Sequence, residues 1–233
     1  MQTPHLNFSA IETIIFDFDG TLTDFVTADR EALETLHQHA QIQVSLEQFI
    51  EIAVEEIMAF HERVEQGREN PLEMHIQRLE HTFERLDIPW KPSYLELYRT
   101  RMIAGCTALE GAHELLHTLR PHYKLGLLTN AYDAQEQRER IQKSGLEHYF
   151  DEIVVAAEIG IYKPQSGIFT HLLERMDTQP SEAVYVGDSP SHDVLGAVGA
   201  GIQAVLVRPG AARPRAGLTV SNLADLREAW VLP

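Results

Sequence analysis

The chain has 233 residues, a length that accommodates one full domain together with a sizeable insertion. Its 19 Lys and Arg against 35 Asp and Glu give a formal net charge of −16, which disfavours general binding to nucleic acid or to an anionic membrane. The single cysteine, Cys106, excludes an intrachain disulfide, and the first residues show no signal peptide or membrane span, so we expect a cytoplasmic protein.

The first predicted element is a buried strand at about residues 12–17 that ends abruptly in acid. Asp17 and Asp19 follow at i and i+2, so in extended backbone their carboxylates should face one place at the carboxyl end of this strand. Gly20 allows the chain to turn immediately and to approach a ligand closely. Two acids beside an apolar strand repel each other, and a metal cation or a shared proton would relieve that cost. A solvated acidic turn is the alternative for this pair alone.

From residue 24 to about residue 104 the pattern is helical throughout. Ser45 fits a helix N-cap, and the apolar residues that follow it recur at helical spacing up to Phe60. This stretch therefore predicts an all-helical block inserted after the first strand.

Beyond Gly105 strands and helices alternate, which is typical of a parallel sheet covered by helices. Such folds bind ligands outside the carboxyl ends of their strands. The predicted strands are 124–129, 153–155, 183–186 and 204–207, and the predicted helices are 112–119, 135–144, 168–176 and 194–200.

Three more polar groups occur at strand ends or in the loops beyond them. Thr129 and Asn130 end one strand, Lys163 precedes Pro164 in a later loop, and Asp188 follows another buried strand, with Asp193 five residues further on. The first two are weak evidence alone, because Thr and Asn end many strands and a Lys-Pro pair is common in surface loops. An ammonium close to the acids at 17 and 19 would, however, offset their mutual repulsion.

Taken together and in order, these four elements resemble the motifs of the haloacid dehalogenase-like (HAD) hydrolase superfamily, and the first reads Asp-Phe-Asp-Gly-Thr-Leu at residues 17–22. The resemblance covers roughly residues 11–24 and 105–207. It implies a Rossmann-like three-layer α/β core with a parallel sheet, formed by residues 1–23 and 105–233. The helical block, residues 24–104, occupies the place of the family's C1-type cap domain.

The resemblance also implies a Mg²⁺-dependent phosphatase that works through an aspartyl-phosphate. Asp17 would be the nucleophile and Asp19 the general acid and base. The Thr129 hydroxyl, the following amide at Asn130, and Lys163 would bind the phosphoryl oxygens.

The implied Mg²⁺ ligands are the Asp17 carboxylate, the Asp19 backbone carbonyl and the Asp188 carboxylate, with Asp193 binding through a water or orienting the other ligands. Octahedral Mg²⁺ keeps several waters, so few protein ligands suffice. Dehalogenases of the superfamily lack a second acid at the position of Asp19, so the phosphatase and phosphomutase branches fit better.

The expected substrate is a small phosphomonoester such as a nucleoside monophosphate, phosphoglycolate or a sugar phosphate, and the expected assembly is a monomer or homodimer. A phosphosugar mutase would carry the same motifs. A non-catalytic binding module is a further alternative, against which the intact acids and Lys163 argue. The run His-Glu-Leu-Leu-His at 113–117 matches the spacing of zinc peptidases, although its leucines are typical of a helix core.

Overall fold

The computed structural model describes residues 10–65, 68, 73–208 and 217–230. It divides into two compact units, which we describe separately. The sheet unit consists of Met1–Asp24 and Thr107–Pro233, and the helical unit of Phe25–Cys106. That the helical unit serves as a cap stays a prediction.

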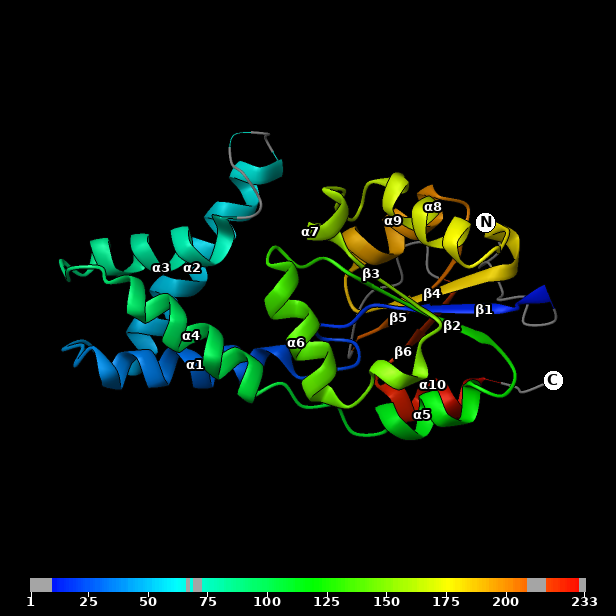
Figure 1. The fold of residues 1–233 in the computed structure, drawn as a ribbon, viewed down its shortest axis with the longest axis horizontal. Coiled ribbons are helices and arrows are strands. Elements are labelled where there is room, and N and C mark those ends of the chain that lie inside the picture. Colours follow the sequence, from blue (N-terminus) through cyan, green and yellow to red (C-terminus); the bar gives the residue numbers. More distant parts are fainter. Residues whose placement is uncertain (1–9, 66–67, 69–72, 209–216, 231–233) are drawn as a thin grey trace. The chain divides into compact units, whose positions relative to one another are not determined.

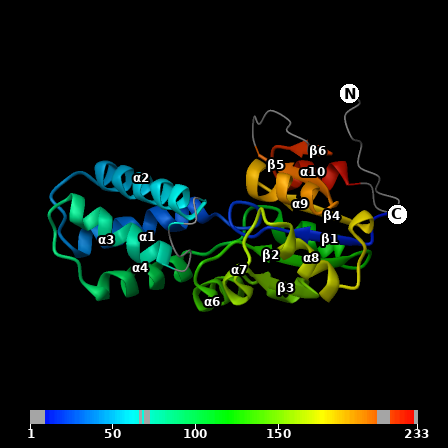
Figure 2. The same ribbon diagram turned by 90° about the horizontal axis from the view of Figure 1, so that it is seen from above.

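The sheet unit contains a six-stranded sheet in the order β3-β2-β1-β4-β5-β6, in which all neighbours are parallel. Figure 2 shows the strands side by side in this order. The strands are β1 (Thr13–Phe16), β2 (Lys124–Thr129), β3 (Glu152–Val155), β4 (Ala183–Gly187), β5 (Gln203–Val207) and β6 (Leu218–Val220). The predicted α/β core with a parallel sheet is confirmed, and the three-residue β6 is the strand that was not predicted, because it is too short to show a pattern.

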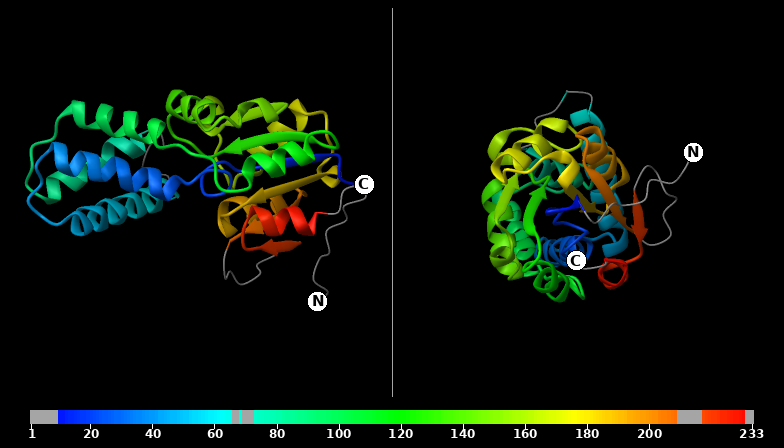
Figure 3. Two further views of the ribbon diagram at one scale, coloured as in Figure 1. Left: turned by 90° about the horizontal axis from the view of Figure 1, so that it is seen from below. Right: turned by 90° about the vertical axis from the view of Figure 1, so that its right-hand side faces the viewer.

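Helices cover both faces of this sheet, with α8 and α9 on one face and α5 and α10 on the other (Figure 1). Figure 3 shows α5 and α10, in green and red, in front of the strands. The helices of the sheet unit are α5 (Ala112–Leu119), α6 (Ala134–Ser144), α7 (Ala156–Ile159), α8 (Ser166–Arg175), α9 (Leu195–Gly199) and α10 (Leu223–Ala229), with single turns η3 (Glu147–Tyr149), η4 (Pro180–Glu182) and η5 (Pro190–Val194). Because both faces are covered, the central strand β1 is mostly apolar, and every one of its residues is buried.

The strand register brings three strand ends together. Phe16, the last residue of β1, lies opposite Leu127 of β2 and Val186 of β4. Asp17, Thr129 and Asp188 therefore all emerge at the carboxyl edge of the sheet, where ligands bind in folds of this type.

The helical unit consists of α1 (Phe25–His39), α2 (Leu46–Glu65), α3 (Met74–Arg85) and α4 (Pro92–Ala104), and its described residues include no strand. The Ser45 hydroxyl accepts a hydrogen bond from the Gln48 backbone N–H (3.2 Å), so Ser45 caps α2 as predicted. Its core gathers apolar side chains from all four helices, among them Leu33, Phe49 and Phe83.

A buried ion pair joins these four helices. Arg78 of α3, whose side chain is fully buried, donates to both carboxylate oxygens of Asp29 on α1 (2.7 and 2.9 Å). Its Nε donates to the Ala53 carbonyl of α2 (2.9 Å), and the Tyr98 hydroxyl of α4 also donates to Asp29. We call these residues the Arg78 cluster.

None of the helices in the described part of the chain is both long enough and apolar enough to cross a membrane.

Candidate active site

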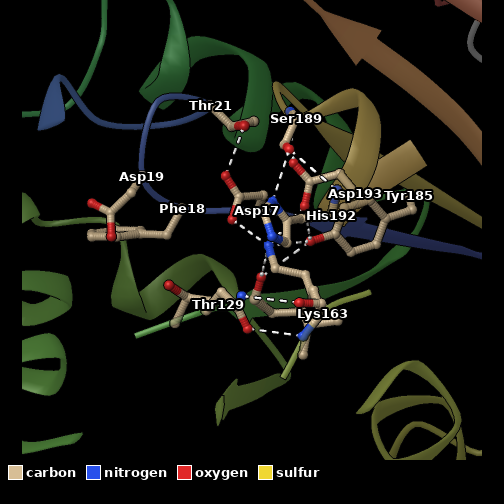
Figure 4. Close-up of polar contacts among 12 residues, drawn as sticks. Asp17, Phe18, Asp19, Thr21, Thr129, Lys163, Tyr185, Ser189, His192 and Asp193 are labelled. Atoms are coloured by element: carbon tan, nitrogen blue, oxygen red, sulfur yellow. Dashed lines mark hydrogen bonds and ion pairs between the residues drawn. The ribbon is translucent and has the colours of Figure 1, made fainter. Parts of the chain in front are cut away.

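A buried ammonium lies at the centre of the carboxyl edge of the sheet (Figure 4). Lys163, in the loop before α8, donates from Nζ to Asp17 Oδ1 and to Asp193 Oδ1, each at 2.7 Å. All three side chains are at least nine-tenths buried. The pKa of Lys163 is raised well above its ordinary value, because the charges of Asp17 and Asp193 outweigh the effect of burial, which alone would lower it.

Two hydroxyl groups that the sequence did not assign complete this arrangement. The Tyr185 hydroxyl of β4 accepts from Lys163 Nζ (2.9 Å) and donates to Asp193 Oδ1 (3.1 Å). The Thr21 hydroxyl donates to Asp17 Oδ2 (2.9 Å). A signal was available for Tyr185, since a hydroxyl inside an otherwise apolar strand needs a buried partner.

Asp17, Asp188 and Asp193 form a group suited to a metal ion, with carboxylate oxygens that lie within 4.8 Å of one another. Burial raises the pKa of Asp17 to about 8; Lys163 opposes the shift, while Asp193 and Asp188 add to it. Burial also raises the pKa of Asp188 to about 6, assisted by the charge of Asp193. Three carboxyl groups thus face one ammonium, and this shortage of positive charge fits a bound divalent cation. An all-oxygen donor set suits Mg²⁺.

Two glycines let the loops of this group approach each other. Gly20 has φ +85°, and a Cβ there would lie 2.8 Å from Asp188 Oδ2. A Cβ on Gly187 would collide with the Asp193 carboxylate. Any larger residue at either position would displace one of the acids.

Asp193 has protein partners on both of its oxygens. Oδ1 accepts from Lys163 and Tyr185, and Oδ2 accepts from the Ser189 backbone N–H (2.9 Å). This arrangement suits a residue that orients the Asp188 loop and Lys163, which is one of the two roles that the resemblance implied for it.

Asp19 departs from the expectation that both opening carboxylates face one place. Its carboxylate points away from Asp17 and Lys163 (Figure 4) and pairs with Arg140 of α6 through both oxygens. The expectation assumed extended backbone, but β1 ends at Phe16, and the N–H groups of Leu22 and Thr23 both bond to the Phe18 carbonyl in a tight turn. The prediction that the two side chains converge is therefore wrong for this structure. The metal ligand predicted at Asp19 is its backbone carbonyl, so that prediction does not depend on where the side chain points.

Thr129 and Asn130 lie where β2 ends. The buried Thr129 hydroxyl accepts from Gln137 Nε2 of α6 (2.9 Å). Asn130 clamps the lysine loop: its Oδ1 accepts from the Lys163 backbone N–H (2.9 Å), and its Nδ2 donates to the Lys163 carbonyl (3.2 Å). The Asn130 side chain thus positions Lys163, which leaves the backbone amide for the predicted phosphate contact.

Sequence reasoning missed Gln137 and Arg140, both almost fully buried. Along α6 the buried face carries Gln137, Arg140, Ile141 and Ser144 at helical spacing. Polar side chains in register with a core isoleucine were the available signal for a buried polar network.

The His-Glu-Leu-Leu-His run lies on α5, and the structure does not support zinc binding there. Leu115 and Leu116 are buried, while His113, Glu114 and His117 are exposed. Among the described residues, side chains close enough to hold a metal are found at Asp17, Asp188 and Asp193.

Residues 14–207 match the family model of the haloacid dehalogenase-like hydrolases, which is most of the chain and includes all of the motif residues above. The chain belongs to this family. It is therefore an enzyme of the hydrolase class, as the resemblance predicted.

Two relatives illustrate this similarity. The chain is 36% identical over 138 residues to pyrimidine 5′-nucleotidase YjjG of Escherichia coli (strain K12), a match that spans 58% of this chain and 60% of that protein. It is 27% identical to N-acylneuraminate-9-phosphatase of Rattus norvegicus over 86% of this chain and 84% of that one.

Solved structures show the same fold. The HAD-hydrolase YfnB from Bacillus subtilis, bound to magnesium, superposes with a TM-score of 0.84 at 22% identity, covering 94% of this chain and 98% of that one. The L-2-haloacid dehalogenase PA0810 superposes with a TM-score of 0.78 at 20% identity, covering the same shares of the two chains. At these identities the superpositions establish the fold and leave the chemistry to the site residues.

Proposed function

We propose that the protein is a Mg²⁺-dependent phosphatase that hydrolyses a small phosphomonoester through an aspartyl-phosphate on Asp17. The observation that carries this proposal is the Lys163 ammonium held between Asp17 and Asp193. With Asp188 these acids make three carboxyl groups beside one ammonium, which leaves room for a divalent cation. The similarity to a pyrimidine 5′-nucleotidase and to an N-acylneuraminate-9-phosphatase supports it. Nucleoside monophosphates, phosphoglycolate and sugar phosphates are the substrate classes we propose.

The first step is transfer of the phosphoryl group to the protein. A carboxylate oxygen of Asp17 attacks phosphorus, the bond from phosphorus to the leaving oxygen breaks, and Asp19 gives its proton to that oxygen. Asp19 turns one of its oxygens from Arg140 toward the leaving oxygen in this step, while its other oxygen keeps its contact with Arg140.

The second step is hydrolysis. Asp19, now a carboxylate, takes a proton from a water molecule as the water oxygen attacks phosphorus. The bond between phosphorus and Asp17 breaks, which releases inorganic phosphate and restores both acids.

The remaining groups position the phosphoryl oxygens and stabilise their charge. Lys163 supplies an ammonium, Thr129 a hydroxyl and Asn130 a backbone amide. Asp17, Asp188 and the Asp19 carbonyl would hold Mg²⁺, while Asp193 orients the ligands. When bound, the ion supplies positive charge that stabilises the transferring phosphoryl group.

The second acid separates this proposal from dehalogenation, which the fold alone would allow. Hydrolysis of a phosphate ester needs a group that protonates an oxygen leaving group, and Asp19 is available for that role.

A phosphate-release assay over a library of phosphorylated metabolites, with Mg²⁺ or with chelator, tests the proposal. We expect release from at least one small phosphomonoester with Mg²⁺ and none after chelation. Analysis of the same reactions for isomerised sugar phosphate discriminates a mutase, which would form isomer in place of free phosphate. Absence of both products over the whole library would overturn the assignment.

A further inference from the structure

Gln137 bridges two of the groups to which the proposed reaction assigns roles. Its Nε2 donates to Thr129 Oγ1 (2.9 Å) and to Asp19 Oδ2 (3.0 Å). Its Oε1 accepts from Arg140 Nη1 (2.8 Å). One buried amide therefore contacts both the phosphate-binding hydroxyl and the second acid.

The hydrogen-bond partners of Gln137 fix the direction of each hydrogen bond that it makes. Arg140 has only donors, so the amide atom that faces it must be the Gln137 oxygen, and the amide NH₂ must face Asp19 and Thr129. Thr129 Oγ1 then accepts a hydrogen bond from Gln137, so its own proton is left to donate to another acceptor. A phosphoryl oxygen at the carboxyl end of β2 would be such an acceptor.

Arg140 acts on the Asp19 carboxylate. Its side chain is 3% exposed, and its two terminal nitrogens contact the two oxygens of Asp19, Nη1 to Oδ2 at 3.1 Å and Nη2 to Oδ1. It is linked to Thr129 through Gln137. Arg140 therefore holds both oxygens of the Asp19 carboxylate, whereas Gln137 contacts one of them and restricts how the Thr129 hydroxyl turns.

We propose that Gln137 and Arg140 are two positioning residues with separable effects, an inference that rests on the proposed phosphatase function. Gln137 directs the Thr129 proton to the phosphoryl group. Arg140 holds Asp19 where it can exchange protons with the leaving oxygen and the attacking water. The phosphoryl group is common to all substrates, but the need for an acid varies with the leaving group.

Substrates with different leaving groups should therefore distinguish the effects of the two residues. We would measure kcat/KM with p-nitrophenyl phosphate, whose leaving group needs little protonation, and with an alkyl phosphate that the wild type hydrolyses. We expect Gln137→Met to lower both values on the order of tenfold, as for loss of one hydrogen bond to a charged group. We expect Arg140→Met to lower the alkyl value at least about tenfold more than the p-nitrophenyl value.

Two further variants guard against a loss that only reflects loosened packing. Arg140→Lys keeps the charge without the paired geometry and should recover part of the alkyl activity. Arg138→Met, on the same helix, removes a partly exposed pair with Glu158 and should leave both substrates unchanged. General destabilisation of α6 would lower both activities of every variant equally.

A double-variant cycle tests the direction of the hydrogen bonds. In Gln137→Glu a carboxylate replaces the NH₂ donor, so the Thr129 hydroxyl must turn and donate to it. Adding Thr129→Val to Gln137→Glu should then cost less than about threefold, although Thr129→Val alone should cost on the order of tenfold or more.

The outcomes are separable from those of the proposed function. If the wild type releases phosphate but Arg140→Met lowers both substrates equally, or the two single losses at 137 and 129 simply multiply, the positioning roles are wrong and the phosphatase assignment stands. If the wild type releases phosphate from no phosphomonoester, the proposed function fails and the inference fails with it.

Discussion

Each of the two units buries a cation against carboxyl groups, but the ratio of cations to carboxyl groups differs. In the Arg78 cluster one guanidinium faces one carboxylate, Asp29, and every contact is paired. In the sheet unit one ammonium, that of Lys163, faces the three carboxyl groups of Asp17, Asp188 and Asp193. We call these four residues the Lys163 cluster.

The pKa values of the buried acids follow this difference. Burial acts to raise the pKa of Asp29, but the charge of Arg78 and the hydrogen bonds from Arg78 and Tyr98 outweigh it and lower the pKa. Burial raises the pKa of Asp17 to about 8, since Lys163 cannot offset it alone. Breaking a balanced buried pair leaves an uncompensated charge and destabilises the fold, whereas an unbalanced cluster is suited to binding a cation.

The largest effect should come from the nucleophile. Asp17→Asn should lower phosphate release on the order of 10⁴-fold or more, because the amide cannot form the acyl phosphate. The thermal midpoint without metal should stay level or rise, since the variant removes a carboxyl group whose ionisation burial disfavours. A large fall in the midpoint would show that the Lys163 cluster is a stabilising element like the Arg78 cluster.

Removing the metal should bring wild-type activity to background. Mg²⁺ should restore it, while Ca²⁺, with its looser coordination, should bind and support little turnover. Full activity after exhaustive chelation would contradict the cation deficit inferred for the Lys163 cluster.

Breaking the Arg78 cluster should affect the stability of the protein and not its catalytic chemistry. Arg78→Met leaves Asp29 buried without its cation and should lower the free energy of unfolding by about 3–5 kcal/mol. Denaturant unfolding measures this, and Arg85→Met, which removes an exposed pair with Glu55 and Glu56, is the matched control that should change little. An unchanged unfolding free energy in Arg78→Met would remove the stabilising role.

The smallest effect is a pH dependence. Protons and Mg²⁺ compete for carboxyl oxygens of Asp17 and Asp188, so Mg²⁺ affinity should rise from pH 6 to pH 8 and level off above, by up to about tenfold per pH unit for each proton displaced. Asp29, whose pKa is lowered by Arg78, stays ionised over this range, so its ionisation should add no pH dependence to the stability of the wild type. Calorimetric titration and thermal melting measure the two quantities, and a pH-independent Mg²⁺ affinity would contradict the raised pKa values.

Short-range patterns predicted the sheet and the strand-end positions of the site. Asp17, Thr129 and Asp188 each end or directly follow an apolar strand, and parallel strands end at one edge. Lys163, 146 residues from Asp17, was placed by resemblance to the family, because no local periodicity relates a loop residue to a strand so distant in sequence.

The side-chain partners could not be predicted in the same way. Asp19 pairs with Arg140, 121 residues away, and the two-residue period that suggested its direction ended with the strand. Tyr185 and Gln137 were read as parts of a strand and a helix, since periodicity tells which face is buried and not which polar atoms meet there.

Covalent trapping tests most directly whether Asp17 and Asp19 divide the two chemical steps. Without a base in Asp19→Ala, the phosphoryl group should remain on Asp17 after p-nitrophenolate has left, and steady turnover should slow on the order of 10²–10⁴-fold. Rapid quench should show a burst of about one p-nitrophenolate per active site, with phosphate on the protein, and no burst with an alkyl phosphate. Normal steady-state turnover in Asp19→Ala, with neither burst nor trapped phosphate, would contradict the assignment.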